Sequence, residues 1–175
     1  MIEDFNLIAT TARGNERAMI NEILFLLRDE LGDTEAKAGK TKIRGLIVAK
    51  TSQNPLVVME KFRGIVAERP YMFRYALRIV PVQRVVPTDL TEIRNVALEM
   101  AKQIGEEQSF RVTVEKRFTE MHSKDIINAS AGDIKRNVDL HNPDWVLQIE
   151  VIGALTGVSL LKPNDVLAVV KEMML

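Results

Sequence analysis

The sequence predicts an α+β protein built as two successive units, residues 1–87 and residues 88–175. Apolar runs typical of buried strands alternate along the chain with longer stretches in which apolar residues follow helical spacing. Glycine and proline residues stand between these stretches, as they do at the ends of helices and strands. Hydrophobic residues make up 46% and charged residues 27% of the 175 residues, which is ordinary for a soluble globular protein. We therefore expect the chain to fold unaided.

The first unit is expected to contain five elements. In the order strand, helix, strand, helix, strand, they cover residues 5–11, 14–31, 42–49, 54–69 and 72–80. Gly32 suits the left-handed turn that ends the first helix, and Asn54 followed by Pro55 is typical of the start of the second. Pro70 ends that second helix. This element order, with two helices covering a small sheet, predicts a ferredoxin-like unit.

The second unit is expected to contain six elements. In the order helix, strand, helix, strand, strand, helix, they cover residues 88–105, 109–118, 123–138, 145–152, 156–161 and 163–173. Thr88 and Ser123 are expected to cap the first two helices. The core stripe of the second helix is expected to be Ile127, Ala131, Ile134 and Val138. The short connection at Gly153 predicts an antiparallel hairpin between the two last strands.

Three segments of this second unit resemble a THUMP domain. They are FRVTVEKRF (residues 110–118), HSKDIINASAGDI (residues 122–134) and VDLHNPDWVLQIEVI (residues 138–152), and they occur in the family's order. The resemblance implies an α/β THUMP domain at residues 88–175 that follows the ferredoxin-like unit. It also implies RNA binding, since THUMP domains are RNA-binding modules of tRNA-modifying systems.

Two further segments narrow the resemblance. RYALRIVPVQRVVPTDL (residues 74–90) and GVSLL (residues 157–161) are similar to stand-alone THUMP proteins that assist tRNA cytidine acetylation. This similarity implies an adaptor that presents tRNA to a separate RNA acetyltransferase that makes N4-acetylcytidine. Aromatic residues make up only 5% of the chain, which favours contact with the acceptor-stem region through phosphates and 2′-hydroxyls over base stacking. Two alternatives stay open: a targeting subunit of a tRNA methyltransferase or thiouridine synthase, and a protein-interaction scaffold that does not bind RNA.

The charge is unevenly distributed, although the formal net charge is zero. Residues 40–84 carry only two acidic side chains, Glu60 and Glu68, against ten basic ones: Lys40, Lys42, Arg44, Lys50, Lys61, Arg63, Arg69, Arg74, Arg78 and Arg84. Such a segment is a candidate phosphate-binding surface, because neutralising phosphates and releasing their counterions supplies most sequence-independent affinity for RNA. The alternative is a set of solvated faces on ordinary surface elements.

Seven residues are the predicted RNA contacts: Arg74, Arg78, Arg111, Lys116, Arg117, Ser123 and Lys124. Strand alternation places Arg111 and Arg117 on one exposed face of their strand. A helix start at Ser123 would add free backbone N–H groups and a positive dipole end. Alternatively, Arg117 and Lys124 form surface ion pairs with Glu120 and Asp125.

The sequence favours a protein without catalysis, cofactor or metal. It contains no cysteine, and His122 and His141 alone do not build a zinc site. No glycine-rich nucleotide-binding loop occurs. Glu115 and Glu150 are better explained as solvated or salt-bridged carboxylates than as an acid–base pair. The acidic start MIEDFNL and the lack of an apolar run of roughly 20 residues predict a cytoplasmic protein.

Overall fold

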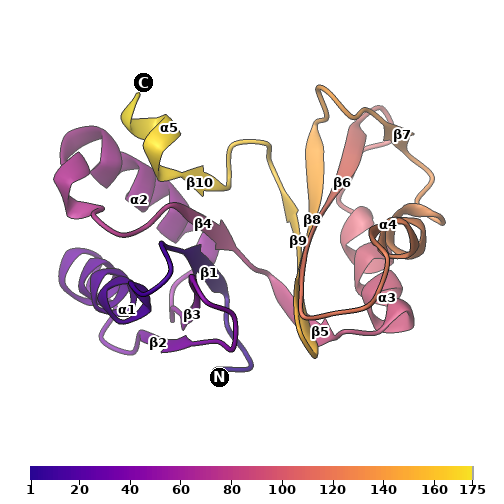
Figure 1. Ribbon diagram of the computed structural model, residues 1–175. Helices are drawn as coiled ribbons and strands as arrows, with labels where there is room; N and C mark the ends of the chain where they lie inside the picture. The colour runs from indigo at the N-terminus through magenta and orange to yellow at the C-terminus, as the bar shows by residue number, and fades with distance from the viewer. Residues whose placement is uncertain (175) are drawn as a thin grey trace. The chain divides into compact units, whose positions relative to one another are not determined.

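The computed structural model describes residues 1–174, which divide into two compact units (Figure 1). Unit 1 comprises residues 1–82 together with the segment from Asp165 onward, and unit 2 comprises Gln83–Asn164. The sequence had suggested a second unit running from residue 88 to residue 175. In the structure, residues 83–87 join unit 2, and the segment from Asp165 packs with unit 1.

Unit 1 contains a five-stranded antiparallel sheet in the order β10-β4-β1-β3-β2. Its elements are β1 (Leu7–Thr10), α1 (Glu16–Phe25), the π-helical turn η1 (Leu26–Glu30), β2 (Lys37–Lys40), β3 (Leu46–Lys50), α2 (Pro55–Glu68), the 3-10 turn η2 (Pro70–Met72), β4 (Arg78–Pro81), β10 (Leu167–Ala168) and α5 (Val169–Met173). The order β4-β1-β3-β2, with α1 and α2 in the connections, is ferredoxin-like, as the sequence predicted.

The core of unit 1 lies between its sheet and its helices. Met19 and Ile23 of α1 and Phe62 of α2 belong to the same buried cluster as the strand residues Leu7 and Ile47. The cap predicted for α2 is confirmed. The side chain of Asn54 accepts a hydrogen bond of 2.9 Å from the backbone N–H of Leu56, and Pro55 occupies the first helical position. Gly32 has a φ of 72° just beyond η1, as expected.

A buried carboxylate, that of Asp33, ties two segments of unit 1 together. The hydroxyl groups of Thr51 and Ser52 each donate to Asp33 at 2.5 Å, and the backbone N–H groups of Ser52 and Glu35 donate at 2.9 and 3.2 Å. Burial opposes ionisation of Asp33, but these hydrogen bonds outweigh it and lower the pKa of the carboxyl. Asp33 therefore joins the start of β2 to the end of β3.

Three sequence expectations for unit 1 were wrong in detail. The strand expected over residues 42–49 begins only at Leu46, as β3, because residues 41–45 form the turn between β3 and β2, a strand that was not expected. The strand expected over residues 72–80 begins only at Arg78. The helix expected over residues 163–173 is shorter, because Leu167 and Ala168 pair with Ile79 and Arg78 before α5 begins.

Unit 2 contains a five-stranded mixed sheet in the order β5-β9-β8-β6-β7. Its elements are β5 (Arg84–Pro87), α3 (Leu90–Ala101), β6 (Ser109–Arg117), α4 (Ser123–Ala131), β7 (Asn137–Val138), β8 (Trp145–Ile152) and β9 (Leu155–Leu161). β6 runs parallel to β7 and β8, whereas β8–β9 and β9–β5 are antiparallel. α3 and α4 cover one face of this sheet (Figure 1). The hairpin predicted at Gly153 joins β8 and β9, and Gly153 has a φ of 58°.

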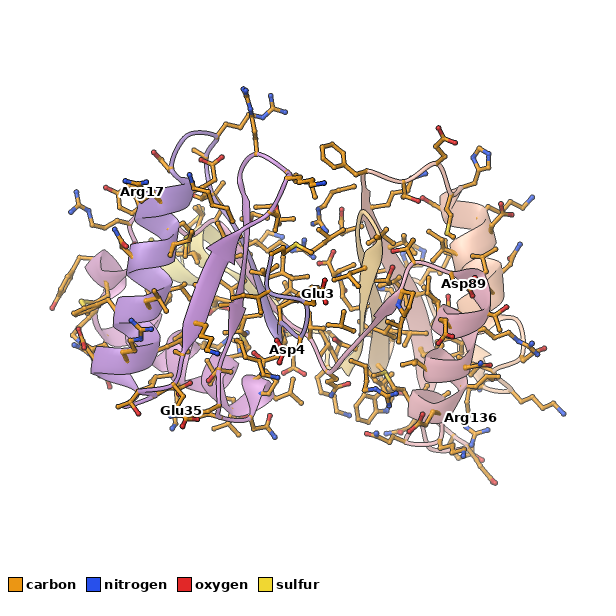
Figure 2. The ribbon with its side chains drawn as sticks, turned by 90° about the horizontal axis from the view of Figure 1, so that it is seen from below. Glu3, Asp4, Arg17, Glu35, Asp89 and Arg136 are labelled. Atoms are coloured by element: carbon orange, nitrogen blue, oxygen red, sulfur yellow. The ribbon has the colours of Figure 1, made fainter. Side chains whose placement is uncertain are left out.

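The helix caps and the core stripe of unit 2 differ from the expectation. Asp89, rather than Thr88, caps α3, since its carboxylate accepts a 3.0 Å hydrogen bond from the backbone N–H of Glu92 (Figure 2). The N-cap of α4 is His122 instead of Ser123. The buried residues of α4 are Ile126 and Ser130. Of the predicted stripe, Ala131 and Ile134 are partly buried against the core, whereas Ile127 and Val138 are exposed. Within residues 1–174, no helix is long and apolar enough to cross a membrane.

Candidate functional site

The predicted RNA contacts fall into two groups that belong to different units. Arg74 and Arg78 lie in unit 1, and the remaining five lie in unit 2: Arg111, Lys116, Arg117, Ser123 and Lys124. In unit 2 the end of β6 and the start of α4 supply four of these five residues. Arg111 lies six residues earlier on β6, and hence about 20 Å from Arg117. Its Nη1 donates to the carbonyl of Leu140 at 3.1 Å.

Arg117 pairs with a buried carboxylate on the neighbouring strand. Its Nη1 donates to Oε2 of Glu150 at 3.1 Å, and the Arg117 side chain is only 18% exposed. Glu150 is 1% exposed, and the side-chain amide of Gln148 donates to its other oxygen at 3.4 Å. A buried carboxylate needs such partners, because an uncompensated charge in the interior is costly. The salt bridge expected for Glu150 is therefore present, and the expected pair of Arg117 with Glu120 is replaced by this one.

Lys116 and the loop after β6 form a braced connection to α4. Nζ of Lys116 donates a hydrogen bond to the carbonyl of Met121 at 3.0 Å. Oγ1 of Thr119 accepts a hydrogen bond from the backbone N–H of Met121 at 3.2 Å. The backbone N–H of Gly153 donates to the carbonyl of Arg117 at 2.9 Å, which holds the loop to the β8–β9 turn. Lys124 then follows in the first turn of α4. It is exposed and, within residues 1–174, has no ion pair with Asp125 or another acid.

Phe118 in this loop has a backbone conformation that no feature of the sequence predicts. Its φ is 55°, and among residues 1–174 it is the one non-glycine residue with a positive φ. The left-handed region is unfavourable for a bulky side chain. Phe118 is also 67% exposed, directly beside Arg117. The structure thus has an exposed aromatic side chain in the loop between the end of β6 and Lys124 at the start of α4.

Arg74 lies in the loop that precedes β4, and Arg78 is the first residue of β4. The guanidinium carbon of Arg74 stands 5.7 Å from the ring centroid of Tyr75. The carboxylate of Glu22 on α1 accepts the backbone N–H groups of Arg74, Tyr75 and Ala76 at 2.6 to 3.2 Å. Arg78 is half-buried within β4, where it is paired in register with Thr10 and Ala168. Arg74 is therefore the exposed member of the two.

Several cations of the basic stretch of residues 40–84 are paired with acidic side chains. Its ion pairs include Lys50 with Asp4, Arg63 with Glu172, Arg69 with Glu30, and Arg84 with Glu99. The hydrogen bonds from Arg69 lower the pKa of the Glu30 carboxyl. Unit 1 as a whole has 14 basic and 12 acidic residues, and unit 2 has 10 and 12. Folding therefore brings acids from outside the stretch against it.

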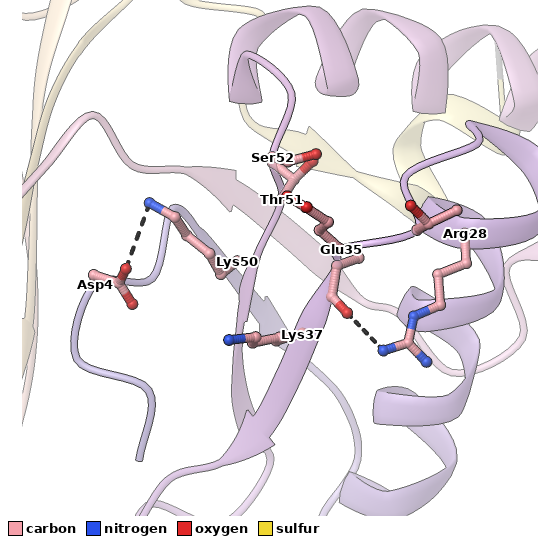
Figure 3. A pocket seen from close by; sticks show the side chains of 9 residues that line it. Asp4, Arg28, Glu35, Lys37, Lys50, Thr51 and Ser52 are labelled. Carbon is pink, nitrogen blue, oxygen red and sulfur yellow. Dashed lines mark hydrogen bonds and ion pairs between the residues drawn. The ribbon is translucent and has the colours of Figure 1, made fainter.

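A cavity of about 560 Å³ in unit 1 lies apart from the predicted contacts (Figure 3). Its lining is of mixed charge: Asp4, Arg28, Thr34, Glu35, Ala36, Lys37, Lys50, Thr51 and Ser52. Arg28 donates to the carbonyl of Ala36 at 2.6 Å, and Lys50 lies 3.8 Å from Asp4. Two of its three cations are therefore engaged by the protein. In the described part of the chain, no group of three or more His, Asp or Glu residues could hold a metal ion.

The family model of the THUMP domain matches residues 87–161. This range begins at the last residue of β5 and ends at the last residue of β9, so it lies entirely within unit 2. It includes the braced loop, α4 and the whole β8–β9 hairpin. No curated protein matches the sequence.

Solved structures share the fold over most of the chain. PH1313 from Pyrococcus horikoshii Ot3 is 21% identical, with a TM-score of 0.58 over 91% of this chain and 55% of its own. TrmN from Thermus thermophilus is 18% identical, with a TM-score of 0.60 over 88% of this chain and 44% of its own. A 4-thiouridine synthetase in complex with RNA and bound ATP is 19% identical, with a TM-score of 0.54 over 91% of this chain and 42% of its own.

This chain spans little more than half of the first of these proteins and less than half of the other two. At such identities the likeness concerns the fold, and that fold extends over both units of this chain. The family match is more specific, because it concerns the sequence of unit 2 itself. The chain carries a THUMP domain at residues 87–161.

Proposed function

We propose that this protein is a non-catalytic tRNA-binding adaptor that presents tRNA to a separate modifying enzyme in the cytoplasm. The observation that carries the proposal is the match of residues 87–161 to the THUMP domain. The shared fold with a 4-thiouridine synthetase solved with RNA supports the same class of role. The RNA acetyltransferase that makes N4-acetylcytidine is the proposed partner, on the resemblance of residues 74–90 and 157–161 to acetylation adaptors.

In this proposal the braced loop and the α4 start contact the RNA backbone. Lys124 is exposed and without an ion pair among the described residues, so its ammonium group is available to a phosphate. Lys116 is also exposed, and its ammonium group donates one hydrogen bond to the carbonyl of Met121. Such contacts suit shape recognition of an A-form helix, such as the acceptor stem, through phosphates and 2′-hydroxyls. Arg117 forms an ion pair with the buried Glu150, so its contribution to RNA binding is secondary.

Binding to total tRNA, compared with a DNA duplex of similar length, tests the proposal directly. We expect tRNA affinity to fall steeply with salt, with a log–log slope of about 0.7 to 0.9 for each phosphate contact. Affinity that does not change with salt, or no preference for tRNA over DNA, would contradict electrostatic tRNA binding. It would favour a scaffold that contacts proteins only.

A second candidate function is a targeting subunit of a tRNA methyltransferase or a thiouridine synthase. The fold likeness to TrmN and to a 4-thiouridine synthetase favours this alternative. Deletion of the gene, followed by analysis of the modified nucleosides in tRNA, separates the candidates. Loss of N4-acetylcytidine supports the acetylation adaptor, whereas loss of a methylated or thiolated nucleoside supports the alternative.

The adaptor proposal also predicts the behaviour of the purified chain. With tRNA and acetyl-CoA plus ATP, or with S-adenosylmethionine, we expect no modified nucleoside to form. Mass spectrometry of the digested tRNA measures this result. Turnover by the pure protein would show that the chain is itself an enzyme.

A further inference from the structure

Two loops of unit 1 that contact each other carry five basic residues from separate parts of the sequence. Three belong to the end of β2 and the turn after it, and two flank the start of α1: Lys40, Lys42, Arg44, Arg13 and Arg17. We call this group the basic cluster. All five side chains are exposed, and none has an ion pair or side-chain hydrogen bond within residues 1–174. Arg17 projects from the first turn of α1 (Figure 2).

Backbone contacts hold the two loops against each other. The backbone N–H of Thr11 donates to the carbonyl of Gly45 at 2.9 Å, and the backbone N–H of Gly45 donates to the Glu16 carboxylate at 2.8 Å. Gly45 has a φ of 78°, and a Cβ added there would lie 2.8 Å from the carbonyl oxygen of Thr11. Only glycine permits this approach. The position of Arg13 relative to the β2–β3 turn is therefore fixed by the backbone.

The β2–β3 turn is also braced internally. Oγ1 of Thr41 donates to the carbonyl of Leu46 at 2.9 Å and accepts the backbone N–H of Ile43 at 3.1 Å. Thr41, Ile43 and Gly45 are turned inward or half-buried, while the alternating Lys42 and Arg44 are exposed. A rigid turn thus presents flexible cationic side chains to solvent.

The acid among these loops does not neutralise the cluster. The carboxylate of Glu16 is held by the backbone N–H of Gly45, and this hydrogen bond lowers its pKa. Its one negative charge is outnumbered by five positive ones. Elsewhere in unit 1, by contrast, Lys50, Arg63 and Arg69 all pair with acids. The basic cluster is therefore a local excess of charge in a unit whose total is nearly balanced.

We infer that the basic cluster of unit 1 binds the phosphate backbone of the RNA, as a second contact surface outside the THUMP domain. The inference rests on the proposed tRNA binding and adds where unit 1 contributes to it. Arginine and lysine side chains bind phosphate through charge-assisted hydrogen bonds and release its counterions. Phosphate contacts carry no base sequence, so the cluster adds affinity for helical RNA of any sequence.

The test compares two double variants of the full chain that remove the same charge. Lys42→Ala with Arg44→Ala removes two members of the basic cluster. Lys61→Ala with Lys171→Ala removes two exposed lysines of α2 and α5 in the same unit. The cluster variant should lower tRNA affinity about tenfold and reduce the log–log salt slope by about 0.7 to 0.9 for each lost contact, with an equal effect on duplex RNA of unrelated sequence. The control variant should change the slope little, and both should keep the wild-type melting temperature.

A third variant tests whether the rigid position of the turn that carries Lys42 and Arg44 contributes to binding apart from their charge. Thr41→Val keeps every charge but removes the side-chain hydrogen bonds of Thr41 that brace the turn. It should weaken tRNA binding less than the cluster variant and leave the salt slope nearly unchanged. Equal affinities of the cluster and control variants would overturn the inference while leaving tRNA binding by the THUMP domain intact. Absence of tRNA binding by the wild-type chain would instead overturn the proposed function, and the inference with it.

Discussion

Unit 1 is assembled from two separate stretches of the chain, whereas unit 2 is one continuous stretch. In unit 1, β10 and α5 return from the far end of the sequence to complete the sheet beside β4. In unit 2, every strand finds its partner between residues 83 and 164. The difference shows that position in the sequence is a poor guide to membership of a unit. It also means that removal of the segment after Asn164 should affect unit 1 but not unit 2.

The largest expected effect comes from removing the segment that follows Asn164. This truncation takes away Leu167 and Val169, which are buried in the core of unit 1. Burial of two such side chains contributes about 3 to 6 kcal/mol, so unit 1 should lose most of its stability. Hydrogen exchange should show loss of protection at β1 and β4, with β8 and β9 unchanged.

Val170→Ala is the matched control for this truncation, because Val170 lies in the same segment but is exposed. We expect it to change the free energy of unfolding by less than about 0.5 kcal/mol. Equal loss of protection in both units of the truncated chain would show that the units do not unfold separately.

The next effect concerns the buried carboxylate of unit 1. Asp33→Asn keeps the size of the side chain but replaces a charged acceptor of four hydrogen bonds, so it should cost about 2 to 3 kcal/mol. Because the folded-state pKa of Asp33 is lowered, its contribution is complete above its unfolded value, near pH 4, and is lost as the pH falls through the folded value. Denaturant titrations from pH 7 downward should show wild type and variant converging in acid. A constant difference would argue against ionised Asp33.

The corresponding test in unit 2 is Arg117→Ala. It removes one partner of the buried Glu150 and should cost about 1 to 2 kcal/mol, less than a fully uncompensated charge, because Gln148 still donates to the same carboxylate. Lys124→Ala is the matched control and should be nearly neutral for stability. If Arg117→Ala also weakens tRNA binding, comparison with Arg117→Lys shows whether the loss follows stability or charge. An unchanged melting temperature for Arg117→Ala would contradict the structural role.

The smallest expected effect has the opposite sign. Phe118→Gly should stabilise unit 2 by about 0.5 to 1 kcal/mol, because glycine adopts a positive φ without the steric cost that phenylalanine incurs. Glu120→Gly in the same loop is the control and should destabilise, since its backbone has no positive φ to relieve. Thermal unfolding of both variants checks the prediction. Destabilisation by Phe118→Gly would mean that packing of the phenylalanine ring stabilises unit 2.

Much of the fold follows from local signals in the sequence. The start of α2 could be placed at Asn54 and Pro55, and the β8–β9 hairpin at Gly153, because each signal acts within a few residues. β2 was missed because Lys37–Lys40, with the sequence KAGK, has no strand character, and only pairing with β3 makes it a strand. β10 was missed for the same reason, since its partner β4 lies far away in the sequence.

The candidate site was less predictable than the fold. The sequence placed Lys116 and Lys124 on either side of one loop, as the structure does. It could not pair Arg117 with Glu150, because that contact depends on the parallel register of β6 and β8. Nor could it join Arg13 to the β2–β3 turn, because those residues meet only after the sheet has formed. Charge counted along the sequence could therefore not identify the basic cluster of unit 1.

The return of the chain at β10 has a consequence for synthesis on the ribosome. Unit 2 can complete its fold once Asn164 has emerged, although it is the second unit to begin. Unit 1 begins first but waits for Leu167 and Ala168, and until then β4 has an open edge that is available for pairing with other chains. The nascent chain should therefore be most prone to aggregation, and most in need of a chaperone, while the THUMP domain is being translated.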